Sequence, residues 1–261
     1  MHETDIINRD GVAAVKPVIN LLHGWGMNAA VFNPLVDTLS ARYRVISINL
    51  PGYGGSDFGD ADFERHLDHL EQRLEQGLLV GWSLGGLYAM GLARRSPGRF
   101  SGLLLVASNP CFVQRDGWRA AMPREMFVEF ADSLAADWQA TIRRFIGLQL
   151  HGADNARELI RIITTLVTAG GAPDPRALEF GLRLLSDVDM RNELANLAIP
   201  TLAILGRRDK LVPASLGQQL ALLNPSIRVE CLARSAHAPF LSHEAEFTGL
   251  LDEFVESTQA G

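Results

Sequence analysis

Short apolar segments alternate with amphipathic segments over the first 108 residues, and this alternation restricts the fold more than any other feature of the chain. Four segments have the composition of buried strands: residues 18–24, 44–52, 77–83 and 102–108. Successive side chains in these segments are apolar, so both faces of each strand should be covered. Strands of this kind, separated by helices, typically form a mostly parallel sheet. The sequence therefore predicts an α/β fold.

A helical region interrupts the alternation after Ser108. From Pro110 to Asp187 the pattern is helical, and the segments 124–150 and 154–171 carry apolar residues three and four positions apart. We therefore expect a helical insertion after the fourth strand.

The last part of the chain returns to the first pattern. Strand-like segments span residues 199–209 and 226–237, and a final helix follows over 245–257. The simplest arrangement is an α/β core with an inserted helical lid, or cap. The predicted core comprises residues 1–109 and 188–261, and the predicted lid comprises residues 110–187.

Length and composition restrict the class of protein. With 261 residues, 47% of them hydrophobic, the chain can bury a large core. A net charge of -6 gives it no electrostatic reason to bind nucleic acid. The two cysteines, Cys111 and Cys231, suit a reducing compartment better than a disulfide scaffold. Because the sequence shows neither a signal-peptide pattern nor an apolar run of membrane-spanning length, we expect a cytoplasmic protein without a membrane partner.

The segment Gly81-Trp82-Ser83-Leu84-Gly85 lies where a predicted strand becomes a predicted helix. It matches the G-x-S-x-G pattern, in which a sharp turn exposes a nucleophilic serine at the carboxyl end of a strand. Glycine is needed beside the serine because larger side chains would clash in so tight a turn. A glycine-rich turn with an idle serine is the alternative, but the flanking strand and helix favour Ser83 as a nucleophile.

A serine nucleophile needs a histidine base, and His237 has the right position for it. In this architecture the order along the chain is serine, acid, histidine, with each residue following a strand. His237 follows the last predicted strand. The other histidines fit less well: His2 is near the terminus, His66 and His69 lie in a charged segment expected to be solvated, His151 is in the lid, and His243 is near the last helix.

Asp209 is the favoured partner that would orient the base. It ends the predicted strand over 199–209, so its side chain should lie with those of Ser83 and His237 at the carboxyl edge of the sheet. Asp187 and Asp189 are alternatives, but they precede this strand instead of ending it.

The loop after the first strand, LLHGWGM, should supply part of an oxyanion hole. The candidate donors are the backbone N–H groups of Trp25 and Leu84, and two such donors would stabilise a tetrahedral oxyanion. His23 is expected to support this loop through hydrogen bonds. Trp25 and Trp82 would either wall the pocket or pack in the core.

No motif indicates a cofactor. In GYGGSD, Asp57 stands where the third glycine of a dinucleotide fingerprint should be. No cluster of histidine, cysteine and carboxylate side chains has the spacing of metal ligands. We therefore expect neither a cofactor nor a metal.

Several of these segments together resemble a known fold. LLHGWG, LPGYGGSD, GWSLGG, GRRDKLVP and SAHAPFLSH resemble the α/β-hydrolase fold with a Ser-Asp-His triad, over essentially the whole chain. More narrowly, VGWSLGGLYA, VASNPCF, RRFIGLQ and AHAPFLSHEAEF resemble the BioH family, the pimeloyl-[acyl-carrier protein] methyl ester esterases of biotin synthesis. The resemblance implies that one methyl ester is hydrolysed while the thioester to the carrier protein stays intact. It also implies substrate contacts at Trp25, Ser83, Leu84, Phe145, Ile146, Gly147, Leu148, Gln149 and His237.

Four arginines stand out in the predicted lid: Arg143, Arg144, Arg157 and Arg161. Between residues 138 and 165 only two acidic residues oppose them. They either form a solvated surface with pairs inside the helices or, as the resemblance suggests, a basic patch that docks an acidic acyl carrier protein.

These inferences predict a serine carboxylesterase that acts on pimeloyl-[acyl-carrier protein] methyl ester and on small esters. A general short-chain carboxylesterase and a C–C bond or lactone hydrolase are alternatives with the same core. A ligand-binding receptor that keeps a hydrolase pocket is the alternative from another class, and it would bind without turnover. A serine nucleophile argues against epoxide hydrolases and dehalogenases of this fold, which use aspartate there.

Overall fold

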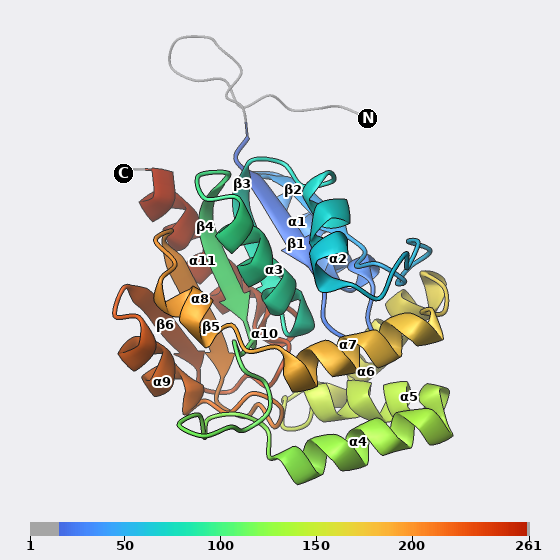
Figure 1. Cartoon of the computed structure of the whole chain (residues 1–261). Coiled ribbons are helices and arrows are strands. Elements are labelled where there is room, and N and C mark those ends of the chain that lie inside the picture. The colour runs from blue at the N-terminus through green and yellow to red at the C-terminus, as the bar shows by residue number, and fades with distance from the viewer. Residues whose placement is uncertain (1–15, 260–261) are drawn as a thin grey trace.

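Six strands form one sheet in the part of the chain that the structure, a computed structural model, describes, which is residues 16–259 (Figure 1). The strand order is β2-β1-β3-β4-β5-β6, and every neighbouring pair is parallel. The parallel sheet confirms the predicted α/β class. The strands are β1 (Val18–Leu22), β2 (Arg44–Ile48), β3 (Gly77–Trp82), β4 (Phe100–Val106), β5 (Thr201–Gly206) and β6 (Ile227–Leu232).

All six predicted strands are present, and each ends earlier than predicted. Apolar side chains continue past the strand ends into loops that fold over the sheet edge, where Trp25 and Leu50 are fully buried. Apolar composition reports burial and not backbone pairing, so it does not mark where a strand ends.

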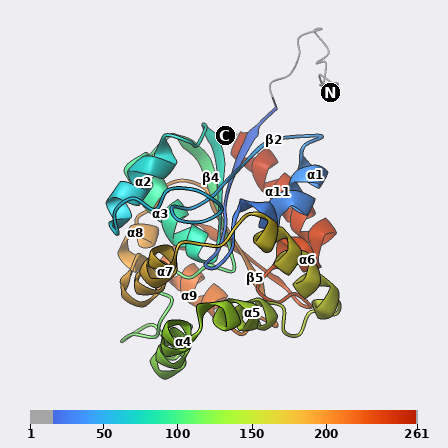
Figure 2. The same ribbon diagram turned by 90° about the vertical axis from the view of Figure 1, so that its right-hand side faces the viewer.

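Helices cover both faces of the sheet (Figure 2). This explains why the central strands β3, β4 and β5 are buried almost throughout, whereas the edge strands β2 and β6 are partly exposed. One face carries α2 (Phe63–Glu71), α3 (Leu84–Arg95), α8 (Arg191–Ala195) and α9 (Leu216–Leu223). The other carries α1 (Asn33–Leu39) and α11 (Glu244–Gln259), and the short helices η1 (Ala29–Phe32) and α10 (Pro239–Ser242) lie in loops.

Five helices lie between β4 and β5 in the described part of the chain. Four of them precede α8 and lie across the carboxyl ends of the strands (Figure 1). They are α4 (Arg124–Ala136), α5 (Trp138–Gln149), α6 (Ala156–Ala169) and α7 (Pro175–Asp187). This arrangement does not by itself set domain boundaries, so the division into core and lid stays a prediction.

Two expectations for the inserted region are wrong in detail. The helix predicted over 124–150 is two helices, because the backbone of Asp137 is extended and its side chain caps α5 by accepting from the Ala140 N–H. Residues 110–123 are not helical. This segment is a loop with isolated bridges between Val113 and Met122 and between Arg115 and Trp118.

The strand order places a crevice beside β1. The chain runs from β1 outward to β2 and then crosses to β3 on the other side of β1. The loops that follow β1 and β3 therefore diverge, and ligands of open α/β sheets bind at such a switch point, outside the carboxyl ends of the strands. Ser83 and the Gly24–Trp25 loop both lie here.

Candidate active site

Ser83 lies in a strained turn between β3 and α3. Its φ of 55° and ψ of -119° lie outside the regions that residues with side chains favour, and such strain costs roughly 1–3 kcal/mol. The packing around the turn maintains this conformation. A Cβ added to Gly81 would lie 2.5 Å from the carbonyl oxygen of Gly85, and one added to Gly85 would lie 2.2 Å from that of Leu22. Only glycine fits at these two positions.

A buried His–Asp pair lies at the same edge of the sheet. The Nδ1 atom of His237 is 2.7 Å from Oδ2 of Asp209, and both side chains are fully buried. The other carboxylate oxygen, Oδ1, accepts hydrogen bonds from the backbone N–H groups of Leu211 at 2.7 Å and Val212 at 3.1 Å. Since Asp209 accepts at every contact, Nδ1 carries the proton, and Nε2 is the free basic nitrogen of the ring.

The structure brings this pair next to the turn of Ser83. The indole Nε1 of Trp82 donates to the carbonyl oxygen of His237 at 2.8 Å, and the two ring centroids are 5.8 Å apart. Nε2 of His237 is buried and has no hydrogen-bond partner among residues 16–259, the Ser83 hydroxyl included. A catalytic hydrogen bond of this kind is often long until substrate binds. The role of Trp82 in holding His237 was not apparent from the sequence.

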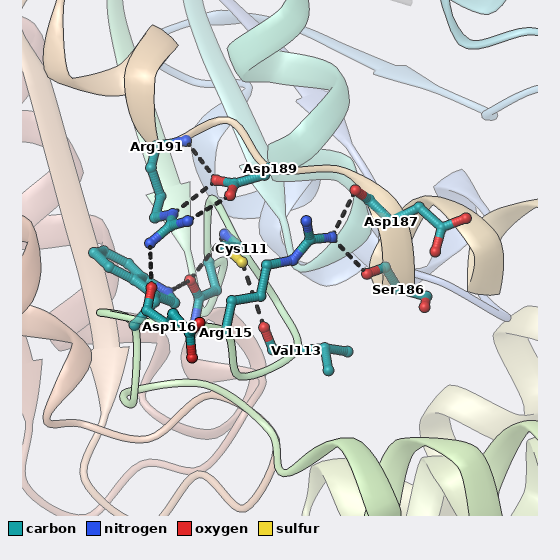
Figure 3. Close-up of polar contacts among 10 residues, drawn as sticks. Cys111, Val113, Arg115, Asp116, Ser186, Asp187, Asp189 and Arg191 are labelled. Carbon is teal, nitrogen blue, oxygen red and sulfur yellow. Dashed lines mark hydrogen bonds and ion pairs between the residues drawn. The ribbon is translucent and has the colours of Figure 1, made fainter.

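The alternative acids lie elsewhere, Asp187 at the end of α7 and Asp189 in the segment that connects α7 to α8 (Figure 3). Asp189 accepts two hydrogen bonds from Arg191, at 2.8 and 2.6 Å, and these lower the pKa of its carboxyl group. The carbonyl oxygen of Asp187, with that of Ser186, accepts from Arg115. The Arg115 contacts join the segment before α4 to the end of α7, and neither carboxylate pairs with His237 among the described residues.

The expectation that His66 is solvated is wrong. It lies on the buried face of α2, where Nδ1 meets the Tyr88 hydroxyl and Nε2 meets the Phe58 carbonyl oxygen, both at 3.0 Å. Residues 66, 67 and 70 share the buried face, and that spacing was the signal in the sequence. His69 and His151 are exposed, and His2 lies outside the described residues.

The loop after β1 packs against the turn of Ser83. A Cβ added to Gly24 would lie 3.2 Å from that of Ser83, so the two segments nearly touch. The N–H of Trp25 donates to no backbone carbonyl in the described part of the chain. The N–H of Leu84 belongs to the first residue of α3 and has no acceptor within the helix. Both amides are therefore available to an anion beside Ser83.

His23 holds this loop in place, as its sequence position indicates. Nδ1 lies 2.9 Å from the Gly24 carbonyl oxygen, and Nε2 accepts from the Leu50 N–H at 3.0 Å. Burial lowers the pKa of His23 to about 4, because a charged ring is poorly solvated there. His23 therefore stays neutral near pH 7 and acts as a structural group.

Acidification should destabilise the fold through His23. Its pKa falls from 6.5 in the unfolded chain to about 4 in the fold, so the unfolded state binds the proton more tightly. The penalty is absent above pH 6.5, grows as the pH falls towards 4, and approaches about 3.5 kcal/mol below it, since a pKa difference of one is worth about 1.4 kcal/mol. Urea unfolding at pH 7.0 and 4.5 measures how much the free energy of unfolding falls on acidification. This fall should be smaller for His23→Gln than for the wild type. Equal losses would contradict this role of His23.

An apolar cavity lies between the Gly24–Trp25 loop and the inserted helices. Its volume is about 60 Å³. The Trp25 side chain reaches into this region: its Nε1 donates to the Leu178 carbonyl oxygen at 2.9 Å, and its ring packs edge-on against Phe145, 5.0 Å between centroids. The lining residues are all apolar: Trp25, Phe112, Met122, Met126, Phe127, Phe130, Phe145, Leu148, Leu182, Leu185 and Leu211. Those on α4 and α7 were not identified from the sequence, because an amphipathic pattern does not say which surface the apolar face meets.

The stretch from Phe145 to Gln149 divides among several surroundings. Phe145 and Leu148 line the cavity, whereas Ile146 faces a cleft between α5 and α6. Gly147 borders an open groove of about 530 Å³ between α4 and α5. Gln149 is fully buried, and its side-chain amide has no hydrogen-bond partner among the described residues, which leaves it available to a ligand.

The four lid arginines are exposed. Arg143 and Arg144 lie on α5, and Arg157 and Arg161 lie on α6. None of them forms an ion pair within residues 16–259. The alternative of pairs inside the helices is therefore not what the structure shows.

Two further searches cover the described residues only. No group of three or more histidine, cysteine, aspartate or glutamate side chains there could hold a metal ion. No helix in that part of the chain combines the length and the apolar character needed to cross a membrane.

Sequence comparison places the chain in a known family. Residues 21–250 match the model of the alpha/beta hydrolase family. A pimeloyl-[acyl-carrier protein] methyl ester esterase from Aeromonas hydrophila subsp. hydrophila is 42% identical over 92% of this chain and 95% of that protein. One from Edwardsiella ictaluri is 41% identical over 93% of this chain and 95% of its own length.

Solved structures agree with the fold. An esterase from Exiguobacterium antarcticum superposes with a TM-score of 0.83 at 23% identity, over 98% of this chain and all of its own. A bromoperoxidase from Bacillus anthracis superposes with a TM-score of 0.82 at 22% identity, over 93% of this chain and 92% of its own. These comparisons confirm the predicted fold, the predicted class of carboxylic ester hydrolase and the resemblance to the BioH family. The chain belongs to the alpha/beta hydrolase family and, within it, to the pimeloyl-[acyl-carrier protein] methyl ester esterases.

Proposed function

We propose that this chain hydrolyses pimeloyl-[acyl-carrier protein] methyl ester, the substrate for which its relatives are named, to pimeloyl-[acyl-carrier protein] and methanol. The observation that carries the chemistry is the buried His237–Asp209 pair, because the His237 ring packs against Trp82, the residue before Ser83, and its Nε2 atom has no hydrogen-bond partner among the described residues. A base, an orienting acid and a strained serine at one strand edge are the parts that acyl transfer needs.

Acylation uses all three side chains. The Ser83 oxygen attacks the ester carbonyl carbon while Nε2 of His237 takes the hydroxyl proton. Asp209 keeps the other ring nitrogen protonated and stabilises the positive ring that forms. The N–H groups of Trp25 and Leu84 hold the negative carbonyl oxygen. The bond to the methoxy oxygen then breaks, and His237 gives its proton to the leaving methanol.

Deacylation repeats these steps with water. His237 takes a proton from the water, whose oxygen attacks the acyl carbon. The bond to Ser83 breaks, the serine recovers its proton from His237, and the carboxylic acid leaves.

The inserted helices act as a lid that forms the acyl site in this proposal. The cavity beside Trp25 is wholly apolar, which suits methylene groups and offers nothing to a charged carboxylate. Met126, Phe130, Phe145 and Leu148 line both this cavity and the open groove between α4 and α5. A chain attached to a large carrier could therefore reach the site through that groove while the carrier stays outside.

An acidic carrier protein would dock on the exposed lid arginines. Unpaired guanidinium groups steer and orient a partner of opposite charge. We expect the double variant Arg157→Glu/Arg161→Glu to lower kcat/KM for the carrier-bound ester by about 10–100-fold, because like charges across an interface cost several kcal/mol. Turnover of a small ester such as p-nitrophenyl butyrate should change less than twofold.

The matched control for this prediction is Arg73→Glu/Arg119→Glu, which makes the same charge change at exposed sites away from α5 and α6, one after α2 and one in the loop before α4. It should leave both substrates nearly unaffected. Docking at α6 is wrong if kcat/KM of the lid variant falls equally for both substrates. It is also wrong if kcat/KM of the control for the carrier-bound ester falls as much as that of the lid variant.

Complementation tests the proposed function as a whole. A bacterium that lacks its own pimeloyl-[acyl-carrier protein] methyl ester esterase should grow without biotin when it expresses this chain. It should fail to grow with the Ser83→Ala variant at equal protein level. Failure of the wild type, with active ester hydrolysis in the lysate, would instead support a general short-chain carboxylesterase, a function that the small size of the apolar cavity also suits.

A further inference from the structure

The connection between α5 and α6 packs against the two loops that carry the proposed acid and base (Figure 2). At the end of α5, the carbonyl oxygen of Gln149 accepts a hydrogen bond from the backbone N–H of His237 at 3.0 Å. Three residues later, the carbonyl oxygen of Gly152 accepts from the Arg208 side chain at 2.7 Å. Arg208 is the residue before Asp209. One short lid segment therefore contacts both catalytic loops.

Asp154 joins the same two loops through its side chain. Its Oδ1 atom accepts from Arg208 at 3.0 Å, and its Oδ2 atom pairs with Arg234, which lies three residues before His237. Hydrogen bonds from Arg234 and Arg208 lower the pKa of Asp154, so the carboxylate is charged at neutral pH. The loops also contact each other, because the Arg208 N–H donates to the Ser235 carbonyl oxygen at 2.9 Å.

We propose that Asp154 is a positioning residue, which holds the loops of Asp209 and His237 in register with each other and with the lid. Asp154 touches no reacting atom, and it acts only through the two arginines. This role rests on the proposed function of the triad.

The ion pairs of Asp154 with Arg208 and Arg234 should affect catalysis more than the stability of the fold. The Asp154 side chain is 47% exposed and those of Arg208 and Arg234 are 40% and 68% exposed, so the pairs are screened by water and add little to stability. Proton transfer between Ser83 and His237 depends more steeply on geometry, since a displacement of about 1 Å can lower a rate 10²-fold. The contacts of Asp154 with Arg208 and Arg234 oppose such a displacement of the two loops.

The experiment compares Asp154→Asn with a matched control, Glu158→Gln. Glu158 is an exposed carboxylate on the first turn of α6 and forms no ion pair among the described residues. We expect Asp154→Asn to lower kcat for p-nitrophenyl butyrate by about three- to tenfold, with KM and the melting temperature nearly unchanged. The rate at which a fluorophosphonate labels Ser83 should fall by the same factor, because labelling needs the aligned base but no product release.

Two further variants separate positioning from a merely structural role. Asp154→Glu should recover most of the lost rate, because it restores the charge near both arginines. Asp154→Asn/Arg208→Met should be less impaired than the product of the two single effects, since the two changes share the loss of the Asp154–Arg208 contact. Labelling that disappears in Ser83→Ala and drops sharply in His237→Ala supports the triad whatever happens at position 154.

The proposal is overturned if Asp154→Asn matches the wild type and Glu158→Gln in kcat and labelling rate. It is also overturned if the rate falls only together with the melting temperature and Asp154→Glu fails to recover it. A fall in kcat and labelling rate at constant KM, with recovery by glutamate, supports it.

Discussion

Ser83→Ala is expected to remove nearly all ester hydrolysis, with a fall in kcat of about 10⁵–10⁶-fold. Alanine keeps the turn and the two oxyanion donors but has no oxygen to attack the carbonyl carbon. The residual rate would come from water held near those donors. Substrate binding should persist, so KM should change far less than kcat.

The fold of this variant should be intact. Two hydrogen bonds hold the Ser83 backbone. Its N–H donates to the Val106 carbonyl oxygen at 3.0 Å, and its carbonyl oxygen accepts from the Ser108 hydroxyl at 2.8 Å. Neither hydrogen bond involves the Ser83 side chain. A melting temperature close to that of the wild type checks this. Ser101→Ala, at an exposed serine of β4, is the matched control and should be fully active. Activity of Ser83→Ala within tenfold of the wild type would rule out Ser83 as the nucleophile.

Asp209→Asn should lower kcat by about 10⁴-fold, as in other serine hydrolase triads. The structure gives the reason. Oδ1 accepts the N–H groups of Leu211 and Val212, so in the variant the amide oxygen takes that position and the NH₂ group faces Nδ1 of His237. The NH₂ group can only donate, which leaves Nδ1 unprotonated and moves the proton to Nε2. Nε2 can then no longer accept the Ser83 proton.

The control for this variant is Asp187→Asn, at the exposed aspartate that the sequence left as an alternative. It should retain nearly full activity. Steady-state kinetics and fluorophosphonate labelling of both variants decide the assignment. A loss of activity in Asp187→Asn with little change in Asp209→Asn would show that Asp209 is not the acid of the triad.

The parts of the site that follow from chain order were predictable. In a parallel sheet the carboxyl ends of all strands meet at one edge, so Ser83, Asp209 and His237 could be expected there from the strands that precede them. The glycines beside Ser83 mark a turn that larger residues cannot form. Both signals are local in the sequence.

Features that depend on long-range packing were not predictable. The apolar pattern continues across Asp137, so the break between α4 and α5 left no trace in the periodicity. The Trp82 indole reaches the carbonyl oxygen of a residue 155 positions away. Asp154 is separated from Arg234 by 80 positions, and a lone aspartate in a lid gives no sign of its partners. Such contacts are set by how the lid sits on the core, which local composition does not encode.

The measurement that tests the central proposal most directly is the intact mass of pimeloyl-carrier-protein methyl ester after incubation with the purified enzyme. We expect the substrate to lose the mass of one methylene group, with the thioester still attached, and Ser83→Ala to cause no change. An unchanged mass, or release of the acyl chain from the carrier, alongside rapid hydrolysis of small esters, would contradict the assignment to the carrier-bound methyl ester.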